Sequence, residues 1–300
     1  MSFRTDDDEP KHRAAREDAL TALAVAAFDD CPDDRLRRVT QSLVRHLHAF
    51  IRDVRLTRAE WETAIGFLTR TGQISDEHRR EFILLSDVLG ASMLTVGVNS
   101  PAIPDATEST VFGPFFVEDA PEYRNGDDIS RGLTGRPCHV HGRVTSTDGT
   151  PVAGARVEVW AADDDGHYDV QYEGAGLAGR GRLLTEADGT YGFWTVQPAA
   201  YPIPQDGPVG ELLTATRHSH MRPAHVHLMV AHEAFETLIT QVFVAGDAWL
   251  DDDAVYGVKP GLIADFVTHG PGTGPGGRRL EEEWSEAEFD IRLAPRSLGD

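Results

Sequence analysis

Two histidines separated by one valine form the most suggestive chemical group in the sequence. In the stretch 221–230, His225 and His227 follow a proline and alternate with apolar residues, as in a β-strand. Side chains two positions apart on a strand lie on the same face, so both imidazoles could bind one metal ion. The spacing alone does not decide this, because an ordinary pair of packed or half-exposed histidines has the same pattern. His139 and His141 repeat the spacing, but no further ligand candidates cluster near them in the sequence.

Two tyrosines in turn-like segments offer a second kind of ligand. Tyr168 lies in DGHYD and Tyr201 in PAAYP, each just after a predicted strand. A free phenol has a pKa near 10 and is a poor ligand for divalent ions at neutral pH, whereas the higher charge of a ferric ion favours binding of the phenolate. Each tyrosine alone is more typical of an amphipathic surface residue. Together, two phenolates and two imidazoles would leave Fe(III) with one net positive charge, which suits an anionic oxygen substrate.

Composition argues against several classes of function. The 300 residues include 28 basic and 49 acidic side chains, a net charge of −21, which disfavours binding to nucleic acid or to an anionic membrane. Two cysteines are too few for a disulfide scaffold. The uncharged run 88–104 is shorter than the ~20 apolar residues of a membrane helix and is broken by prolines. The acidic start is unlike a signal peptide, so we expect a soluble cytoplasmic protein without membrane insertion.

Helical patterns fill the first third of the chain. Apolar residues recur every three or four positions, and the expected helices cover 12–30, 36–54, 57–72 and 75–93. Thr57 and Glu60 form a capping box for the third helix, and Ser75 is expected to cap the fourth. We therefore assign residues 1–105 to an N-terminal helical region.

The remainder is typical of β-structure. After a connection rich in proline and glycine, strands are predicted near 138–145, 155–162, 182–186, 191–197, 224–231, 237–245, 262–267 and 287–293. Asp188-Gly189 is a strong hairpin signal between two of them. Regularly spaced short strands predict an antiparallel β-sandwich, so the fold class is mainly β, with a β-sandwich catalytic domain at 106–300.

The order of several motifs resembles the intradiol ring-cleaving dioxygenases. These motifs are VEVWAAD at 157–163, GHY at 166–168, PAAY at 198–201, RPAHVH at 222–227 and TQVFVAGD at 240–247. ESTVFGPFF at 108–116 and EFILLSD at 81–87 are similar to the branch that cleaves hydroxyquinol. The resemblance covers nearly the whole chain. It implies a β-sandwich whose N-terminal helical region forms a homodimer interface, often with a bound phospholipid.

The resemblance also implies roles for individual residues. Tyr168, Tyr201, His225 and His227 match the four protein ligands of one non-haem Fe(III) per subunit. Tyr201 also matches a tyrosine that helps accept a substrate proton, and Arg222 and Gln241 match catalytic residues beside the iron. The positions that match the ring pocket of the hydroxyquinol branch are Leu84, Asp87, Val111, Phe112, Gly113, Pro114, Phe115, Ile203, Pro204 and Val255.

The implied activity is cleavage of hydroxyquinol (1,2,4-trihydroxybenzene) by O2, giving 3-hydroxy-cis,cis-muconate, the enol form of maleylacetate. Asp87 favours this substrate, because its carboxylate could accept a hydrogen bond from the third ring hydroxyl, and catechol would leave it unpaired. The alternative substrate is catechol itself, giving cis,cis-muconate. Two other classes stay open. One is a cupin-type Fe(II) enzyme, which would leave the tyrosines unused. The other is a non-enzymatic β-sandwich binding module, because fold does not fix function.

Overall fold

The chain consists of two compact units, residues 1–69 and 70–300. The computed structural model describes residues 8–76, 79–100, 103–172 and 176–296. The helices that begin in the first unit are α1 (Asp8–Ala26), α2 (Asp34–Asp53) and α3 (Arg58–Ile74). The first three expected helices are therefore confirmed to within a few residues.

Local hydrogen bonds define where α2 and α3 begin. The Asp33 carboxylate accepts from the backbone N–H groups of Arg35 and Leu36 at 2.8 and 2.9 Å, which satisfies two donors that a helix start leaves free. Thr57 and Glu60 form the predicted capping box: Glu60 Oε2 accepts from Thr57 N at 2.8 Å, and Thr57 Oγ1 accepts from Glu60 N at 3.3 Å.

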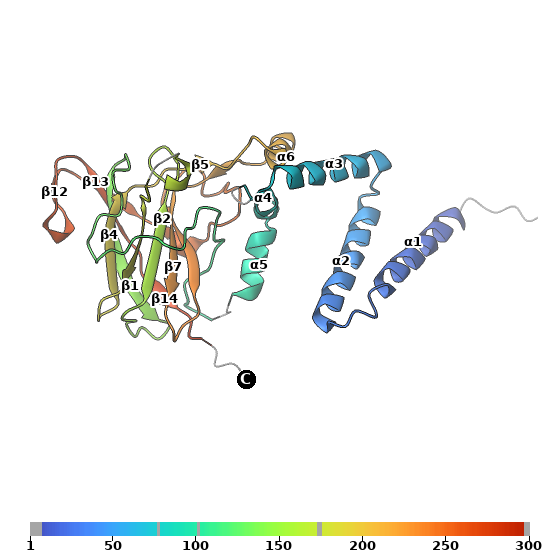
Figure 1. Ribbon diagram of the computed structural model, residues 1–300, viewed down its shortest axis with the longest axis horizontal. Helices are drawn as coiled ribbons and strands as arrows, with labels where there is room; N and C mark the ends of the chain where they lie inside the picture. The colour runs from blue at the N-terminus through green and yellow to red at the C-terminus, as the bar shows by residue number, and fades with distance from the viewer. Residues whose placement is uncertain (1–7, 77–78, 101–102, 173–175, 297–300) are drawn as a thin grey trace, which may run out of the picture. The chain divides into compact units, whose positions relative to one another are not determined.

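Two β-sheets packed face to face form the core of the second unit (Figure 1). The first sheet has the order β10 (Phe266–His269), β13 (Trp284–Glu288), β1 (Pro137–Ser146) and β14 (Ile291–Leu293), with β4 (Thr190–Val196) also paired to β1. The second has the order β3 (Arg180–Leu184), β2 (Arg156–Ala161), β7 (His225–Ala231), β8 (Leu238–Val244) and β9 (Ile263–Ala264). Val140 and Phe193 of the first sheet and Val159 and Val226 of the second are buried in one core.

The predicted sandwich is confirmed, but its sheets are mixed rather than purely antiparallel. β1 is parallel to both β13 and β14, and β8 is parallel to β9. Parallel neighbours need long connections, and here the last third of the chain returns to lie beside β1. The expected hairpin at Asp188-Gly189 is also wrong. The turn forms, with Gly189 N donating to Glu186 O at 2.9 Å, but β3 and β4 on either side of it belong to different sheets.

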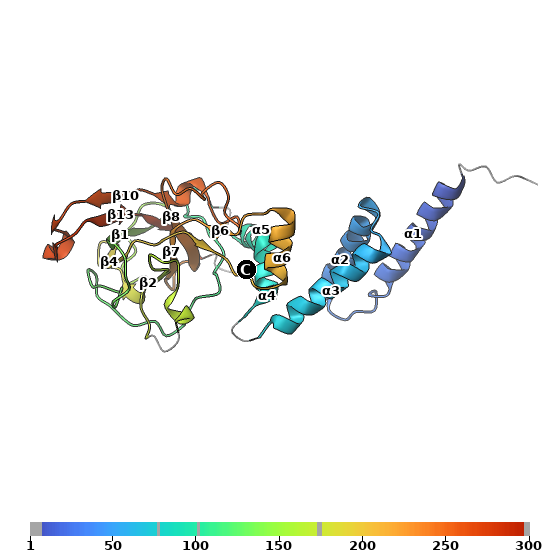
Figure 2. The ribbon, with the colours of Figure 1, turned by 90° about the horizontal axis from the view of Figure 1, so that it is seen from above.

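The fourth expected helix is two helices, α4 (Glu81–Val88) and α5 (Ala91–Asn99). Gly90 separates them, because its backbone has the left-handed conformation (φ 69°), which does not occur inside an α-helix. Ser75 caps neither, because its hydroxyl donates to Thr71 O at 2.7 Å at the end of α3. The helix α6 (Pro208–Thr216) escaped prediction, and it lies with α4 and α5 beside the sandwich (Figure 2).

The remaining described elements are short. They are β5 (Tyr201–Pro202), β6 (Met221–Arg222), β11 (Gly272–Thr273), β12 (Arg279–Leu280) and 3-10 turns at Asp169–Gln171, Pro260–Leu262 and Pro275–Gly277. Within the described residues, no single helix has the length and apolar character to cross a membrane, although the bent pair α4 and α5 passes such a test when taken together.

Candidate active site

His225 and His227 lie on β7, the central strand of the second sheet. The intervening Val226 is fully buried in the sandwich core, so the two imidazoles project from the outer face of the sheet. Each is nevertheless only 1% exposed. The reason is local: the His227 ring stacks on Trp160, its partner on β2, with ring centroids 4.8 Å apart. The pair is therefore held rigidly and shielded from solvent.

Both imidazoles are in the neutral form that binds metals. Burial and the nearby Arg222 charge lower the pKa of His225 to about 3. Burial and the neighbouring His225 lower the pKa of His227 well below its ordinary value. His225 Nδ1 lies 2.7 Å from the carbonyl oxygen of Pro223 and donates to it, which makes Nε2 the unprotonated nitrogen of the ring. The two Nε2 atoms are 3.1 Å apart.

Tyr168 and Tyr201 come from separate segments and meet the histidine pair. Tyr168 directly precedes the 3-10 turn Asp169–Gln171, and Tyr201 opens β5. The Tyr168 hydroxyl is 3.4 Å from the Tyr201 hydroxyl and 3.5 Å from His225 Nε2. These contacts, with the one between the histidines, bring four donor atoms into one cluster. The structure thus unites all four residues that the sequence matched to an iron site.

The chemistry of this cluster fits a highly charged cation. Burial raises the pKa of Tyr168 well above 10, and the adjacent Tyr201 raises it further, so a phenolate there requires compensating positive charge. Two neutral imidazoles cannot supply that charge. A trivalent ion can, and two phenolate oxygens with two imidazole nitrogens suit Fe(III).

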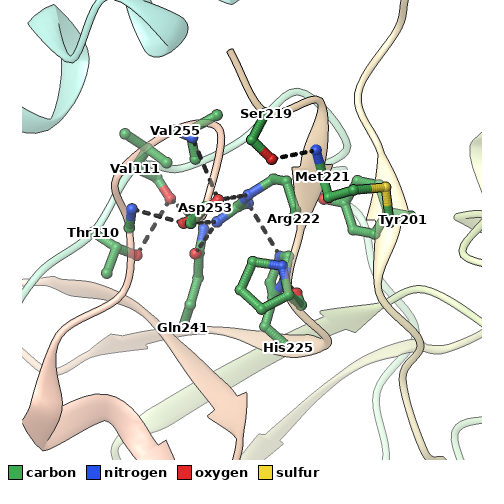
Figure 3. Close-up of polar contacts among 12 residues, drawn as sticks. Thr110, Val111, Tyr201, Ser219, Met221, Arg222, His225, Gln241, Asp253 and Val255 are labelled. Carbon is green, nitrogen blue, oxygen red and sulfur yellow. Dashed lines mark hydrogen bonds and ion pairs between the residues drawn. The ribbon is translucent and has the colours of Figure 1, made fainter. Parts of the chain in front are cut away.

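Arg222 is the centre of a buried polar network beside the cluster (Figure 3). Its Nη2 donates to Gln241 Oε1 at 2.7 Å, its Nε donates to Asp253 Oδ1 at 3.1 Å, and its Nη1 lies 3.2 Å from His225 Nε2. Gln241 in turn donates to the carbonyl oxygen of Val111 at 3.1 Å. Burial alone would raise the pKa of Asp253, but the charge and hydrogen bonds of Arg222 lower it below the usual range. The guanidinium is thus fixed in position by two partners and directed at the cluster.

A second buried ion pair, between Arg180 and Asp169, helps to hold Tyr168 in place. Arg180 on β3 donates through Nε to Asp169 Oδ2 at 2.6 Å, and its Nη2 pairs with the other carboxylate oxygen. Arg180 Nη1 also donates to the carbonyl oxygen of Phe115 at 3.0 Å. The Phe115 ring stacks on Tyr168 at 4.4 Å. One arginine therefore holds both the residue after Tyr168 and the ring packed on it.

A cavity of about 290 Å³ opens next to the cluster. Nine of the ten predicted pocket residues line it: Leu84, Asp87, Val111, Gly113, Pro114, Phe115, Ile203, Pro204 and Val255. Tyr201 and Arg222 also line it, so the cavity reaches the candidate metal ligands. Phe112 is the exception, because its ring packs away from the cavity among aromatic side chains, 4.5 Å from Phe116 and 5.6 Å from Trp160.

Gly113 brings the cavity wall against the metal ligands. A Cβ atom there would lie 3.1 Å from His227 Cε1, and the backbone φ of +76° also disfavours a side chain.

Sequence reasoning missed Asp253, Asp169 and Arg180. Asp169 did stand in a quoted motif next to Tyr168, but Asp253 ends the run Asp251-Asp252-Asp253, which has the pattern of a solvated surface. The other histidine pair, His139 and His141, lies on β1 in the opposite sheet and contributes nothing to this cluster.

Comparison with known proteins agrees with this geometry. The family described as Dioxygenase matches residues 111–295, and the one described as Catechol dioxygenase N terminus matches residues 33–107. A hydroxyquinol 1,2-dioxygenase of Rhodococcus opacus is 54% identical over 297 residues, which cover 98% of this chain and 99% of the relative. A 6-chlorohydroxyquinol 1,2-dioxygenase of Cupriavidus pinatubonensis is 56% identical over 255 residues, covering 85% of this chain and 92% of the relative.

A solved structure also resembles this chain over nearly its whole length. The hydroxyquinol 1,2-dioxygenase from Pseudomonas putida DLL-E4 matches with a TM-score of 0.89 and 39% identity, covering 94% of this chain and 100% of that one. The chain therefore belongs to the intradiol dioxygenases, a family of enzymes that use non-haem iron. The resemblance seen in the motifs is confirmed, and the cupin and binding-module alternatives are excluded.

Proposed function

We propose that the protein cleaves hydroxyquinol between its two vicinal hydroxylated carbons with O2, giving 3-hydroxy-cis,cis-muconate, the enol form of maleylacetate. The reaction takes place at one Fe(III) per subunit, held by Tyr168, Tyr201, His225 and His227. The observation that supports this most strongly is the buried cluster of two phenol oxygens and two imidazole nitrogens at the end of a cavity of aromatic-ring size. A relative named for the same activity, the hydroxyquinol 1,2-dioxygenase of Rhodococcus opacus, matches 98% of this chain.

The ion supplies Lewis acidity, which favours the deprotonated diol and makes the ring reactive towards O2. The side chains around the site supply the proton acceptor, the positive charge and the orientation of the ring. Tyr201 is both a proposed ligand and part of the cavity wall, so its Oη is placed to accept a proton from an entering hydroxyl group. The fixed guanidinium of Arg222 stabilises negative charge as it develops on the bound ring, and Gln241 keeps that guanidinium in place.

The apolar walls of the cavity orient the ring and exclude water. Leu84, Phe115, Ile203 and Val255 form these walls, with Phe115 packed on Tyr168. Held in this way, a diol presents both oxygens to the ligand cluster and its opposite edge to the α4 side of the cavity.

Asp87 on that side selects the substrate. It is 7% exposed, and burial raises its pKa, while the Ser92 hydroxyl and the Arg222 charge act in the opposite direction. Its carboxylate accepts a hydrogen bond from the third hydroxyl of hydroxyquinol. Catechol lacks this group and leaves the acceptor position that faces the ring without a partner, at a cost of about 1–3 kcal/mol, or roughly 5- to 150-fold in kcat/KM.

The test is a substrate comparison with purified, iron-loaded protein. We expect one O2 consumed per hydroxyquinol, the muconate product, and kcat/KM for hydroxyquinol roughly 5- to 150-fold above that for catechol. Preferred cleavage of catechol would assign the protein to the alternative, catechol 1,2-dioxygenase. Failure to cleave either diol with iron bound would overturn the proposed chemistry as a whole.

We also propose that the protein is a cytoplasmic homodimer. Residues 1–105 form its dimerisation region, with a phospholipid site between helices, and residues 106–300 form its catalytic domain. The two family matches meet between residues 107 and 111, which supports this boundary, although the division by contacts lies at residue 69. An apolar stripe on α2 is 44–64% exposed in the single chain, comprising Leu36, Val39, Leu43, Leu47 and Phe50. Sedimentation analysis tests the dimer, and mass spectrometry of an organic extract tests the lipid.

A further inference from the structure

A second group of metal-binding side chains lies on the outer face of the first sheet. His139 and His141 on β1 alternate with Cys138 and Val140, which are fully buried in the sandwich core. The two imidazoles therefore project away from that core. Glu286 on β13 pairs in register with His139, which places its carboxylate on the same face. None of these three residues has a role in the proposed dioxygenase reaction.

The three side chains converge on one point. Glu286 Oε1 lies 3.2 Å from His141 Nε2 and 3.9 Å from His139 Nδ1. One ligand atom from each residue lies within 4.8 Å of the other two. Two ligands at ordinary bond lengths from a tetrahedral zinc ion are about 3.3 Å apart, so the contact between His141 and Glu286 already has that spacing. To complete the site, His139 must move closer to the other two side chains.

His139 has a buried nitrogen with no partner in the described protein. The residue is 8% exposed, and Nδ1 makes no hydrogen bond, because 3.9 Å to Glu286 is too long for one. A buried polar atom left unpaired is costly, so it calls for an explanation. A cation between His139 and Glu286 provides one, since it satisfies the nitrogen and the carboxylate together.

Neighbouring residues hold the group in place. Glu286 Oε2 also lies 3.0 Å from Nε2 of His269 on β10, an ion-pair distance without hydrogen-bond geometry, so a third imidazole stands beside the group. Two tryptophans pack on imidazole rings of this region. The ring centroid of Trp194 lies 4.9 Å from that of His139, and the ring centroid of Trp284 lies 4.3 Å from that of His269. His139, His141 and Glu286 also line an open hollow on the surface, which gives an ion access from solvent.

We propose that His139, His141 and Glu286 form a second metal site, which binds one divalent ion of the zinc type. Two imidazole nitrogens and one carboxylate oxygen suit zinc, nickel or copper(II), whereas calcium and magnesium prefer oxygen ligands alone. The site differs from the first in having no phenolate among its three donors, so it has no preference for a trivalent ion. A bound ion links β1 to β13, one of the two strands that run parallel to β1 in the first sheet, and its effect is on stability rather than on ring cleavage.

Calorimetric titration of the iron-loaded protein with Zn²⁺ tests the site. The variants are His141→Ala and Glu286→Gln, with Glu288→Gln as the matched control. Glu288 carries an exposed carboxylate two positions further along β13, on the same strand face as Glu286. Its replacement by Gln removes the same charge without removing a proposed ligand. Circular dichroism in metal-free buffer establishes that each variant folds, and iron content is measured before and after each titration.

We expect the native protein and Glu288→Gln to bind one Zn²⁺ per chain with equal affinity and to retain iron. Both ligand variants should bind it at least about tenfold to a hundredfold more weakly. The melting temperature should rise with zinc in the native protein and not in the ligand variants. Zinc binding that is absent, or equally strong in the ligand variants, or accompanied by a matching loss of iron, overturns the proposal. These readouts do not involve turnover, so they are independent of the proposed dioxygenase reaction.

Discussion

The carboxylate of Asp253 accepts hydrogen bonds from both Nε and Nη2 of Arg222, at 3.1 and 3.3 Å, where neither side chain is more than 5% exposed. The pair lies immediately behind the proposed iron ligands, since Arg222 Nη1 is 3.2 Å from His225 Nε2. A buried guanidinium needs a counter-charge, and Asp253 supplies one from the loop that follows β8. Asp253 therefore determines where the positive charge of Arg222 stands relative to the substrate.

Replacing Asp253 by Asn should impair both catalysis and folding. Removal of one partner leaves the Arg222 charge buried without compensation, so we expect the free energy of unfolding to fall by about 3 kcal/mol. The guanidinium also loses its fixed position, and kcat/KM for hydroxyquinol should fall by about 10- to 100-fold. Asp252→Asn removes an exposed charge one residue away and should change neither quantity. Steady-state kinetics and chemical denaturation measure the two effects, and an Asp253→Asn enzyme with native kinetics would contradict the assignment.

A methyl group at Gly257 should disturb the same network without changing its charge. A Cβ atom there would meet Arg222 Nη2 at 3.0 Å and both Asp253 Oδ2 and Gln241 Oε1 at 3.1 Å. All three atoms must shift by a few tenths of an ångström, and small misplacements near reacting groups are costly, so kcat/KM should fall by about tenfold for Gly257→Ala. Gly97→Ala, which has open space around it in α5, is the control and should keep native activity. Equal activity of the two variants would mean that the position of Arg222 is not critical.

The sequence predicted best those features that depend on near neighbours. Alternation around His225 and His227 predicted a strand, and the structure places them on β7. The capping box of Thr57 and Glu60 also formed as expected. In both cases the controlling contacts lie within a few residues, where periodicity and capping rules apply.

Features that depend on distant partners could not be predicted in this way. Asp253 meets Arg222 across 31 residues of chain, and nothing in its acidic surroundings distinguishes it from a solvated carboxylate. The turn at Asp188-Gly189 was identified correctly, but the sheet that each flanking strand joins is decided by the packing of the whole sandwich. The metal and pocket residues required the resemblance to a family, because spacing alone did not separate His225 and His227 from His139 and His141.

Substrate choice should respond to Asp87. The variants Asp87→Asn and Asp87→Leu remove the charged acceptor proposed for the third hydroxyl group. For Asp87→Leu we expect the ratio of kcat/KM for hydroxyquinol to that for catechol to fall by roughly 10- to 100-fold, because the hydrogen bond is lost for one substrate only. Asp87→Asn, which retains an acceptor oxygen, should lie between the native protein and the leucine variant. Parallel losses on both substrates would show that Asp87 maintains the cavity and does not select the ring.

The turn after β1 should contribute stability that depends on pH. Hydrogen bonds from the Ser146 hydroxyl and from Thr150 lower the pKa of Asp148 to about 2. The carboxylate is thus more easily protonated in the unfolded chain, where its pKa is near 4. Its contribution is complete above about pH 5 and is lost as the pH falls towards about 2. The difference in melting temperature between the native protein and Asp148→Ala should shrink over that range, with Asp251→Ala as a control for the loss of one surface charge. A difference independent of pH would exclude the carboxylate as its source.

Two neighbouring tyrosines allow a matched test of the proposed iron ligands. Tyr168 is fully buried with its hydroxyl 3.5 Å from His225 Nε2, whereas Tyr172 is 41% exposed and donates to Asp163 Oδ2 at 2.6 Å. An Fe(III)–phenolate bond gives visible colour, so Tyr168→Phe should weaken the absorption band and reduce activity by at least about a hundredfold, more than an outer contact would cost. Tyr172→Phe removes the same hydroxyl four residues away and should retain both colour and iron. Because Arg180 and Phe115 hold Tyr168 independently of its hydroxyl, the Tyr168→Phe variant should still fold, and its iron content and spectrum can be measured directly. Native colour in Tyr168→Phe would remove this residue from the ligand set.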